Sequence, residues 1–354
     1  MRPKIILLFL SVLVFTLTSF SQIGGKYAFQ FLDQPVSARI AALGGNQLSV
    51  NDGDINVAFV NPSMINPRLN NSLGFNYNYM YEGINYGSLQ YANTFNKAGS
   101  FMATLQFMDY GTFDYADASG NISGTFSASD FAVNVGWGRQ LDSSFSIGAT
   151  AKFIYSFYET YTAFGLGVDV AGTYTSKHDW TMSLVARNIG YQVKGYVSGY
   201  TDPLPFDLQF AVSKRLEHVP FRFSIIFDQL TDWNLAYEDP SNPSGGTDPI
   251  TGEPEYNSGF AAFGDELMRH LIFGGEVYIG KSLVLRGGYN YRRRQEMQLP
   301  NAPGMTGFSW GIGVRVYKFK FNYGRAVMFQ SGSPNYLSLT FDLDSFTDDK
   351  PVRF

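Results

Sequence analysis

The sequence predicts an all-β protein, a transmembrane antiparallel β-barrel of about 14 strands, and three observations lead to this fold class. Large apolar residues alternate with small or polar ones in fourteen separate segments, charge is scarce, and the connections alternate between short and long. Of the 354 residues, 45% are hydrophobic, 17% aromatic and 16% charged. Ordinary globular chains carry about 25% charged residues. A disordered chain is excluded, because it would be rich in charge and poor in aromatics.

The residue inventory excludes further classes. The chain has no cysteine, which rules out a disulfide scaffold and thiolate redox, nucleophilic or zinc-binding chemistry. Its formal net charge is -4, so we expect no nucleic-acid partner.

Residues 1–21 are predicted to be a secretory signal peptide. Arg2 and Lys4 precede an apolar run from Ile5 to Phe15, and cleavage is expected after Ser21. The run is shorter than the ~20 residues that a membrane-spanning helix needs. We therefore expect export by the general secretory route to the outer membrane of a diderm bacterium.

The alternating segments form the predicted barrel, residues 72–343. Because successive side chains of a strand point to opposite faces, each segment has one apolar face. The other faces carry charged residues such as Lys152, Asp169 and Arg187. The chain offers too few amphipathic helices to cover fourteen apolar faces, whereas lipid covers them in a closed barrel. The segments are 73–79, 89–91, 101–107, 131–137, 145–155, 164–170, 180–184, 206–212, 223–227, 271–279, 283–291, 308–314, 319–323 and 337–341.

Loop length separates the two predicted ends of the barrel. Short links follow the even-numbered segments, and the long links follow odd-numbered ones, as in barrels with short periplasmic turns and longer outer loops. The long links are 110–126, 190–203, 230–268, 293–306 and 326–334. The loop 230–268 is the longest and includes an acidic stretch at 238–266, and residues 344–354 are expected to form a C-terminal tail.

Residues 22–71 do not alternate and are predicted to be a plug or hatch in the lumen. Ser37 can cap a short helix that Gly44 and Gly45 would end. A fourteen-strand barrel leaves a lumen that would leak solutes if it were empty. A periplasmic arm is the alternative. The stretch Asn51 to Asp54 is interpreted as a turn.

Two stretches carry a resemblance to a known family. The segment from Phe31 to Gly45, with Asn61 and Pro62 downstream, resembles the opening of the PorV/PorQ group of outer-membrane proteins. The block from Pro203 to Gln209 is similar to PorQ-like members in particular. The residues shared with this motif, expected to join plug and barrel, are Ser37, Arg39, Gly44, Gly45, Asn61 and Pro62.

The resemblance implies a FadL-like barrel of the type IX secretion system. It implies membership of the cell-surface attachment complex, with PorZ-, PorU- and PorV-like partners. That complex removes a C-terminal signal from secreted cargo and links the cargo to anionic lipopolysaccharide. PorQ-like members resemble outer-membrane anchors rather than catalysts.

No catalytic, cofactor-binding or metal-binding set is predicted. His178, His218 and His270 are isolated, without triad or metal-ligand spacing. The triplet Arg292, Arg293 and Arg294 ends the eleventh strand on the predicted outer side. The triplet is interpreted either as part of a solvated loop or as a contact with lipopolysaccharide. The outer surface of the barrel is expected to contact outer-membrane lipid.

Two alternatives to a secretion component stay open. A FadL-like transporter of hydrophobic small molecules would use residues 22–71 as a movable hatch, but the predicted lumen positions are polar and small. An outer-membrane enzyme would need a histidine among the outer loops, and only His270 lies near one.

Overall fold

The computed structural model describes residues 27–81, 83–236, 246–247, 251, 254–255, 259–297, 304–328 and 332–347. The predicted signal peptide, part of the acidic stretch 238–266 and the end of the predicted tail lie outside these residues. Within the described ranges, no helix is long and apolar enough to cross a membrane.

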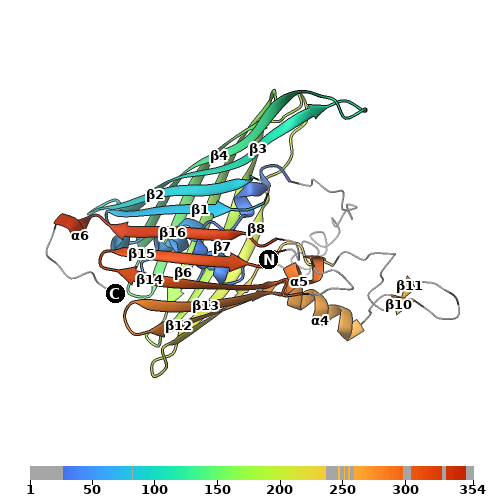
Figure 1. Ribbon diagram of the computed structural model, residues 1–354. Helices are drawn as coiled ribbons and strands as arrows, with labels where there is room; N and C mark the ends of the chain where they lie inside the picture. Colours follow the sequence, from blue (N-terminus) through green and yellow to red (C-terminus); the bar gives the residue numbers. More distant parts are fainter. Residues whose placement is uncertain are drawn as a thin grey trace, which may run out of the picture.

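Fourteen antiparallel strands close into a barrel, each beside its neighbour in the sequence (Figure 1). The strands are β1 Ser72–Tyr79, β2 Asn85–Phe95, β3 Gly99–Ala116, β4 Ile122–Gln140, β5 Phe145–Tyr158, β6 Tyr161–Thr175, β7 Trp180–Lys194, β8 Asp207–Arg215, β9 Phe221–Phe227, β12 Leu271–Ile279, β13 Leu283–Asn290, β14 Phe308–Val316, β15 Phe319–Ala326 and β16 Asn335–Asp342. Outside the barrel wall are a two-stranded ribbon, β10 Gly246–Thr247 and β11 Pro254–Glu255, and the helices α4 Gly259–Arg269, α5 Tyr291–Met297 and α6 Asp344–Thr347.

The predicted fold class is confirmed. Each of the fourteen alternating segments coincides with one barrel strand. β1 pairs with β2 on one side and with β16 on the other, so that Phe75 faces both Leu89 and Leu339. Closure pairs the two edge strands, which is what a sheet in hydrocarbon requires.

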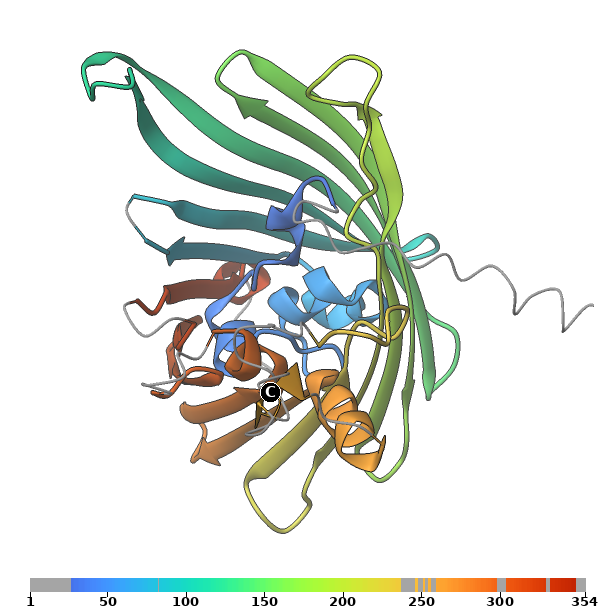
Figure 2. The same ribbon diagram turned by 90° about the vertical axis from the view of Figure 1, so that its right-hand side faces the viewer.

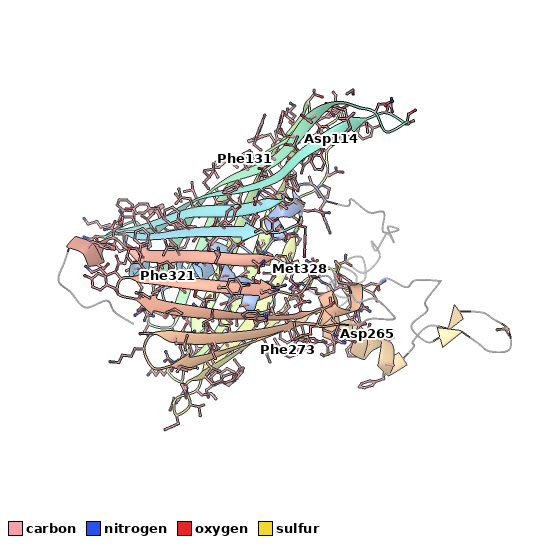
Figure 3. The ribbon with its side chains drawn as sticks, in the orientation of Figure 1. Asp114, Phe131, Asp265, Phe273, Phe321 and Met328 are labelled. Carbon is pink, nitrogen blue, oxygen red and sulfur yellow. The ribbon has the colours of Figure 1, made fainter. Side chains whose placement is uncertain are left out.

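The barrel is apolar outside and polar inside. Val133 on β4 is 48% exposed, whereas its neighbour Asn134 is 2% exposed and faces the lumen. Figure 3 shows side chains projecting from the outer wall, Phe131 and Phe321 among them. This distribution is the reverse of that in a soluble protein, and a bilayer is the medium that solvates it. The chain is an outer-membrane type of β-barrel.

The long connections all lie at one end of the barrel, together with the short turn at 159–160, and the other end has short turns alone (Figure 1). By the usual arrangement of such barrels, the short-turn end is periplasmic and the long-connection end is outside. At the outer end β3 and β4 continue as a hairpin beyond their neighbours (Figure 1).

That hairpin corrects the predicted loop at 110–126. β3 runs to Ala116 and β4 begins at Ile122, because aromatic rings pair across the two strands. Phe113 and Phe126 stack with ring centroids 5.3 Å apart. Polar residues between the rings conceal the alternation in the sequence. The predicted link 190–203 likewise begins later, since β7 extends to Lys194.

Residues 27–71, here called the plug, lie inside the barrel (Figure 2). The plug elements are η1 Gln30–Asp33, α2 Ala38–Ala42, α3 Ile55–Val60, η2 Pro62–Met64 and η3 Pro67–Leu69. Ser37 caps α2 by accepting from Ile40 N, and Gly44 and Gly45 follow the helix with φ of 96° and 100°. Apolar plug side chains such as Ile40 form a core with inward wall residues such as Ile272.

Val133→Arg should destabilise the folded barrel by about 2–4 kcal/mol, because the residue faces hydrocarbon at mid-strand. The matched control is Ile122→Arg on the same strand, which lies in the hairpin outside the membrane and should cost about 0.5 kcal/mol or less. Urea titration in lipid vesicles, scored by heat-modifiable gel migration, measures both. Equal destabilisation of the two variants would contradict the placement of the bilayer.

Candidate functional site

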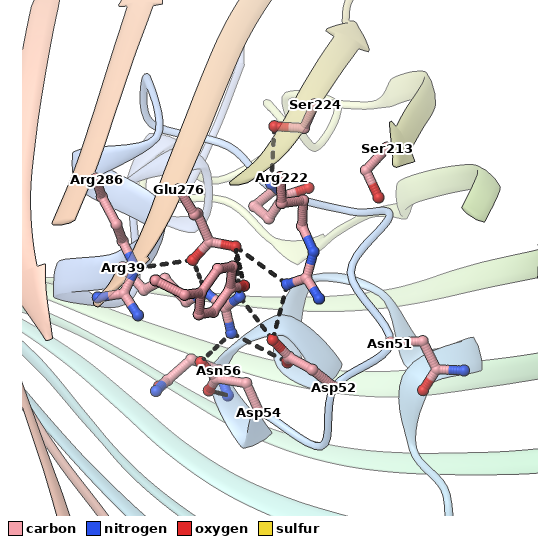
Figure 4. A network of polar contacts seen from close by, with 12 residues as sticks. Arg39, Asn51, Asp52, Asp54, Asn56, Ser213, Arg222, Ser224, Glu276 and Arg286 are labelled. Atoms are coloured by element: carbon pink, nitrogen blue, oxygen red, sulfur yellow. Dashed lines mark hydrogen bonds and ion pairs between the residues drawn. The ribbon is translucent and has the colours of Figure 1, made fainter. Parts of the chain in front are cut away.

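Arg39 of α2 lies at the centre of an ion cluster that joins the plug to the wall (Figure 4). Its Nη2 lies 2.8 Å from Glu276 Oε2 on β12, and its Nε donates to Glu276 Oε1 at 3.0 Å. Its Nη1 and Nη2 also contact Asp54 Oδ2 and Asp52 Oδ2, each at 2.8 Å. Arg39 is 3% exposed, and a guanidinium buried to this degree requires such pairing.

The wall supplies two further arginines. Arg222 on β9 and Arg286 on β13 flank Glu276 in the strand register. Arg222 Nη1 contacts Glu276 Oε2 at 3.1 Å and Asp52 Oδ2 at 2.9 Å, and Arg286 Nε contacts Glu276 Oε1 at 2.9 Å. The cluster therefore combines three arginines with three carboxylates and is electrically balanced.

The neighbouring arginines change the pKa of the Asp52 carboxyl. Burial raises the pKa of its carboxyl, but Arg39 and Arg222 outweigh this effect and hold the pKa well below its usual range. Asp52 is therefore ionised at any physiological pH and keeps its contacts with both arginines.

Glycines of the wall receive the plug backbone directly. A Cβ added to Gly148 would overlap the backbone of Pro62, and one added to Gly138 would overlap the carbonyl of Ile65. On the opposite wall, Gly288 of β13 meets the backbone at Leu43. No side chain separates plug and wall at these points, so each position requires glycine for close approach.

A fourth such contact and several hydroxyl groups complete the attachment. Gly324 of β15 lies against the carbonyl of Ala38, whose N donates to Ser338 Oγ at 2.9 Å. Ser309 Oγ accepts from Gly44 N at 2.9 Å and donates to the Ala42 carbonyl at 3.0 Å.

The other side of the plug is held in the same way. Asn61 caps η2, and its Nδ2 donates to Thr173 Oγ1 of β6 at 3.2 Å. Ser63 Oγ lies 2.6 Å from the same Thr173 Oγ1, and Thr173 in turn lies 2.8 Å from Ser183 Oγ. The plug is thus bonded to strands around the barrel.

A second polar group holds the outer part of the plug. Lys152 Nζ pairs with Asp169 Oδ2 at 2.8 Å and donates to Asn188 Oδ1 at 2.6 Å. Asn188 lies at a bulge in β7 with φ 56°, and its Nδ2 contacts Asp33 Oδ1 at 3.3 Å. Arg187 Nη2 donates to the Leu32 carbonyl at 3.0 Å. Lumen charges therefore pair with one another and with the plug.

In the structure, each of the six residues of the predicted plug–barrel motif either contacts another part of the barrel or caps a plug helix. Ser37 caps α2, Arg39 enters the ion cluster, Asn61 and Pro62 contact β5 and β6, and Gly44 bonds β14. An added Cβ on Gly45 would meet the Arg293 guanidinium 2.5 Å away.

The arginine triplet requires a correction. The sequence predicts that a strand ends there, but β13 ends at Asn290 and residues 291–297 form α5, which brings the Arg293 guanidinium against Gly45 of the plug. Arg292 Nη2 contacts Asp228 Oδ2 at 3.2 Å, and Arg294 Nη1 donates to the carbonyls of Gly304 and Thr306 at 3.4 Å. Contact of the triplet with lipopolysaccharide stays a prediction, and two of the three guanidinium groups already have partners within the protein.

Sequence reasoning missed most of the ion cluster. The sequence predicts a turn at Asp52 and Asp54, but it does not predict that both carboxylates pair with Arg39. The available signal was the charge of Glu276 and Arg286 on inward strand faces. His270 is 1% exposed, and its two ring nitrogens contact the carbonyls of Asp228 at 2.8 Å and Trp233 at 3.2 Å. These two contacts hold the buried imidazole ring in place, which is a structural role.

Comparison with known proteins identifies the fold. No protein-family profile matches the chain, and no curated protein sequence matches it. A solved structure of a TodX mutant, described as a monoaromatic hydrocarbon channel, is similar with 11% identity and a TM-score of 0.50, over 88% of this chain and 99% of that one. The toluene transporter TodX of Pseudomonas putida is 12% identical with a TM-score of 0.49, over 87% of this chain and 96% of that one. A FadL homologue of Pseudomonas aeruginosa is 12% identical with a TM-score of 0.47, over 87% of this chain and 98% of that one. The likeness to the TodX mutant shows that the two chains share a barrel fold.

Glu276→Gln should lower the stability of the bound plug by about 3–5 kcal/mol, because it leaves three buried arginines with two carboxylates. The chain has no cysteine, so Ser49→Cys in the plug provides a single buried thiol for labelling. The urea concentration at which a maleimide labels Cys at position 49 measures plug release. Glu217→Gln in the exposed turn between β8 and β9 is the control and should leave it unchanged. An unchanged midpoint in Glu276→Gln would contradict the role of the cluster.

Proposed function

We propose that this protein is a closed, non-catalytic outer-membrane barrel that anchors partners at the cell surface, as a component of the type IX secretion system. The observation that carries the proposal is the direct contact of plug backbone with wall glycines, which leaves no clearance at Gly138, Gly148, Gly288 and Gly324. The sequence resemblance to PorQ-like proteins supplies the particular system.

The attachment of the plug argues for a barrel that stays closed. Release of the plug would separate the ion cluster, leaving Glu276 and Arg222 in the lumen without Arg39 and Asp52. It would also break the hydrogen bonds at Ser309, Ser338 and Thr173. A transport cycle would have to break and remake all of these contacts, whereas an anchor uses the rigidity that they provide.

The outer end offers a surface suited to protein partners. The β3–β4 hairpin extends outward, and apolar side chains are exposed beside the mouth, with Phe260 at 89% and Tyr200 at 77%. Exposed apolar groups of this size, placed beyond the membrane, are typical of interaction sites. In the proposed role this surface binds PorZ- and PorU-like proteins of the attachment complex, which process cargo and link it to lipopolysaccharide.

A transporter of hydrophobic small molecules is the second candidate, and the comparisons favour it. Structures of this fold include a toluene transporter and a monoaromatic hydrocarbon channel. In this function the plug would be a movable hatch. The two candidates therefore differ in whether the plug must move.

A disulfide between plug and wall separates the two functions. Ser63 Oγ and Thr173 Oγ1 lie 2.6 Å apart, so Ser63→Cys combined with Thr173→Cys should allow a cross-link in a chain that has no other cysteine. We expect the oxidised variant to retain wild-type processing and surface attachment of secreted cargo. The reduced variant and Ser63→Cys alone are the controls. Loss of attachment, or loss of hydrocarbon uptake, only after oxidation would favour a hatch that moves.

Co-purification tests the proposed partners. A tagged barrel extracted in mild detergent should recover PorZ- and PorU-like proteins, and deletion of its gene should leave cargo uncleaved or released into the medium. Recovery of the barrel alone, with normal cargo attachment after deletion and reduced uptake of aromatic compounds, would contradict the anchoring function and support the transporter.

A further inference from the structure

The outer wall of the barrel contains a hollow of about 580 Å³. It is lined by six adjacent strands, β3, β2, β1, β16, β15 and β14, mainly through their outward side chains, with the inward-facing positions Asn76, Ser88, Asn322 and Ser338 between them. We call this hollow the lipid-facing groove.

Two rows of paired residues form the lipid-facing groove. Phe75 and Leu339 lie opposite each other at its middle, and Tyr77 and Leu337 form the next row toward the outside. Its sides are formed on β3 and β14, the first by Leu105 and Phe107 and the second by Ile312 and Val314. These positions are apolar, and Leu337 is 54% exposed.

A glycine deepens the floor. Gly87 of β2 lies between Tyr77 and Phe107 in the register. A Cβ there would lie 2.7 Å from the Phe107 ring, which rests on the bare backbone instead. The end of the ring therefore lies directly over the Gly87 backbone at this side of the groove.

A cation stands at the outer end of the lipid-facing groove. Arg325 points outward, two residues beyond Tyr323 on β15, which at roughly 3.4 Å per residue places it about 7 Å further out. It is exposed, and among the described residues its guanidinium has no hydrogen-bond or ion-pair partner. Near Arg325, the Tyr323 hydroxyl donates a hydrogen bond to Asn335 Oδ1 at 2.7 Å.

We propose that the lipid-facing groove is a binding site for lipid A, with an acyl chain along the apolar floor and a phosphate on Arg325. The surroundings of the groove are hydrocarbon, so its occupant must be apolar along the strands. Arg325 lies where the outer-leaflet headgroups lie, and guanidinium groups favour phosphate oxygens. The site is distinct from the arginine triplet on α5 and does not depend on whether the barrel anchors proteins or transports small molecules.

Native mass spectrometry of the detergent-purified protein with added lipid A tests the site. We expect one retained lipid A per barrel. Arg325→Gln should weaken retention at least fivefold by removing the phosphate contact, and Leu337→Trp should do so by filling the groove. Phosphatidylethanolamine, which carries no net charge, should be retained at least fivefold less than lipid A by the wild type.

Matched controls on the convex wall decide the outcome. Arg139→Gln removes an exposed outward cation at the periplasmic end of β4, and Leu184→Trp enlarges an exposed outward leucine of β7. Both should retain lipid A as the wild type does, and heat-modifiable migration verifies that every variant is folded. Equal retention in all variants would mean unspecific annular lipid and overturn the proposal. A dimer that is lost only in Leu337→Trp, with lipid A retention unchanged, would also overturn it.

Discussion

The contact between plug backbone and wall glycines is the constraint on which the rest of the structure depends. Where Gly148 receives Pro62 and Gly324 receives Ala38, two backbones touch without side chains between them. Such proximity places Ser309, Ser338 and Thr173 within hydrogen-bond distance of the plug, and it brings Arg39 to Glu276. Larger residues in place of these wall glycines would displace the plug and break both the ion cluster and the hydrogen bonds.

The electrostatics of the lumen follow from this packing. An arginine as buried as Arg39 is costly unless its charge is compensated, and an uncompensated partner would be costly as well. The wall supplies Glu276 between Arg222 and Arg286, and the plug supplies Asp52 and Asp54, so no charge of the cluster is left over. The cluster therefore fixes the position of the plug, because the buried charges of the plug are compensated only where these six groups meet.

Much of the fold was predictable because a lipid-facing strand shows its alternation in the sequence. The segment 131–137 has a large apolar residue at every second position, and the structure places it in β4 with that face outward. The hairpin at 110–126 escaped prediction because its aromatic pairs are surrounded by polar residues outside the membrane. The ion cluster escaped prediction because Arg39 and Glu276 lie 237 residues apart, and nothing local in the sequence pairs them. Ser37 and Gly44 were found because helix caps are local signals.

The central claim, that the plug is a fixed part of the wall, is tested most directly by amide hydrogen exchange of the protein in lipid nanodiscs. The account predicts that peptides from residues 38–45 and 61–65 exchange as slowly as peptides from the wall strands β5 and β14 that contact them. Exchange of the plug peptides that is faster than that of these strands by a hundredfold or more would contradict it, because the plug would then leave the wall without the barrel opening.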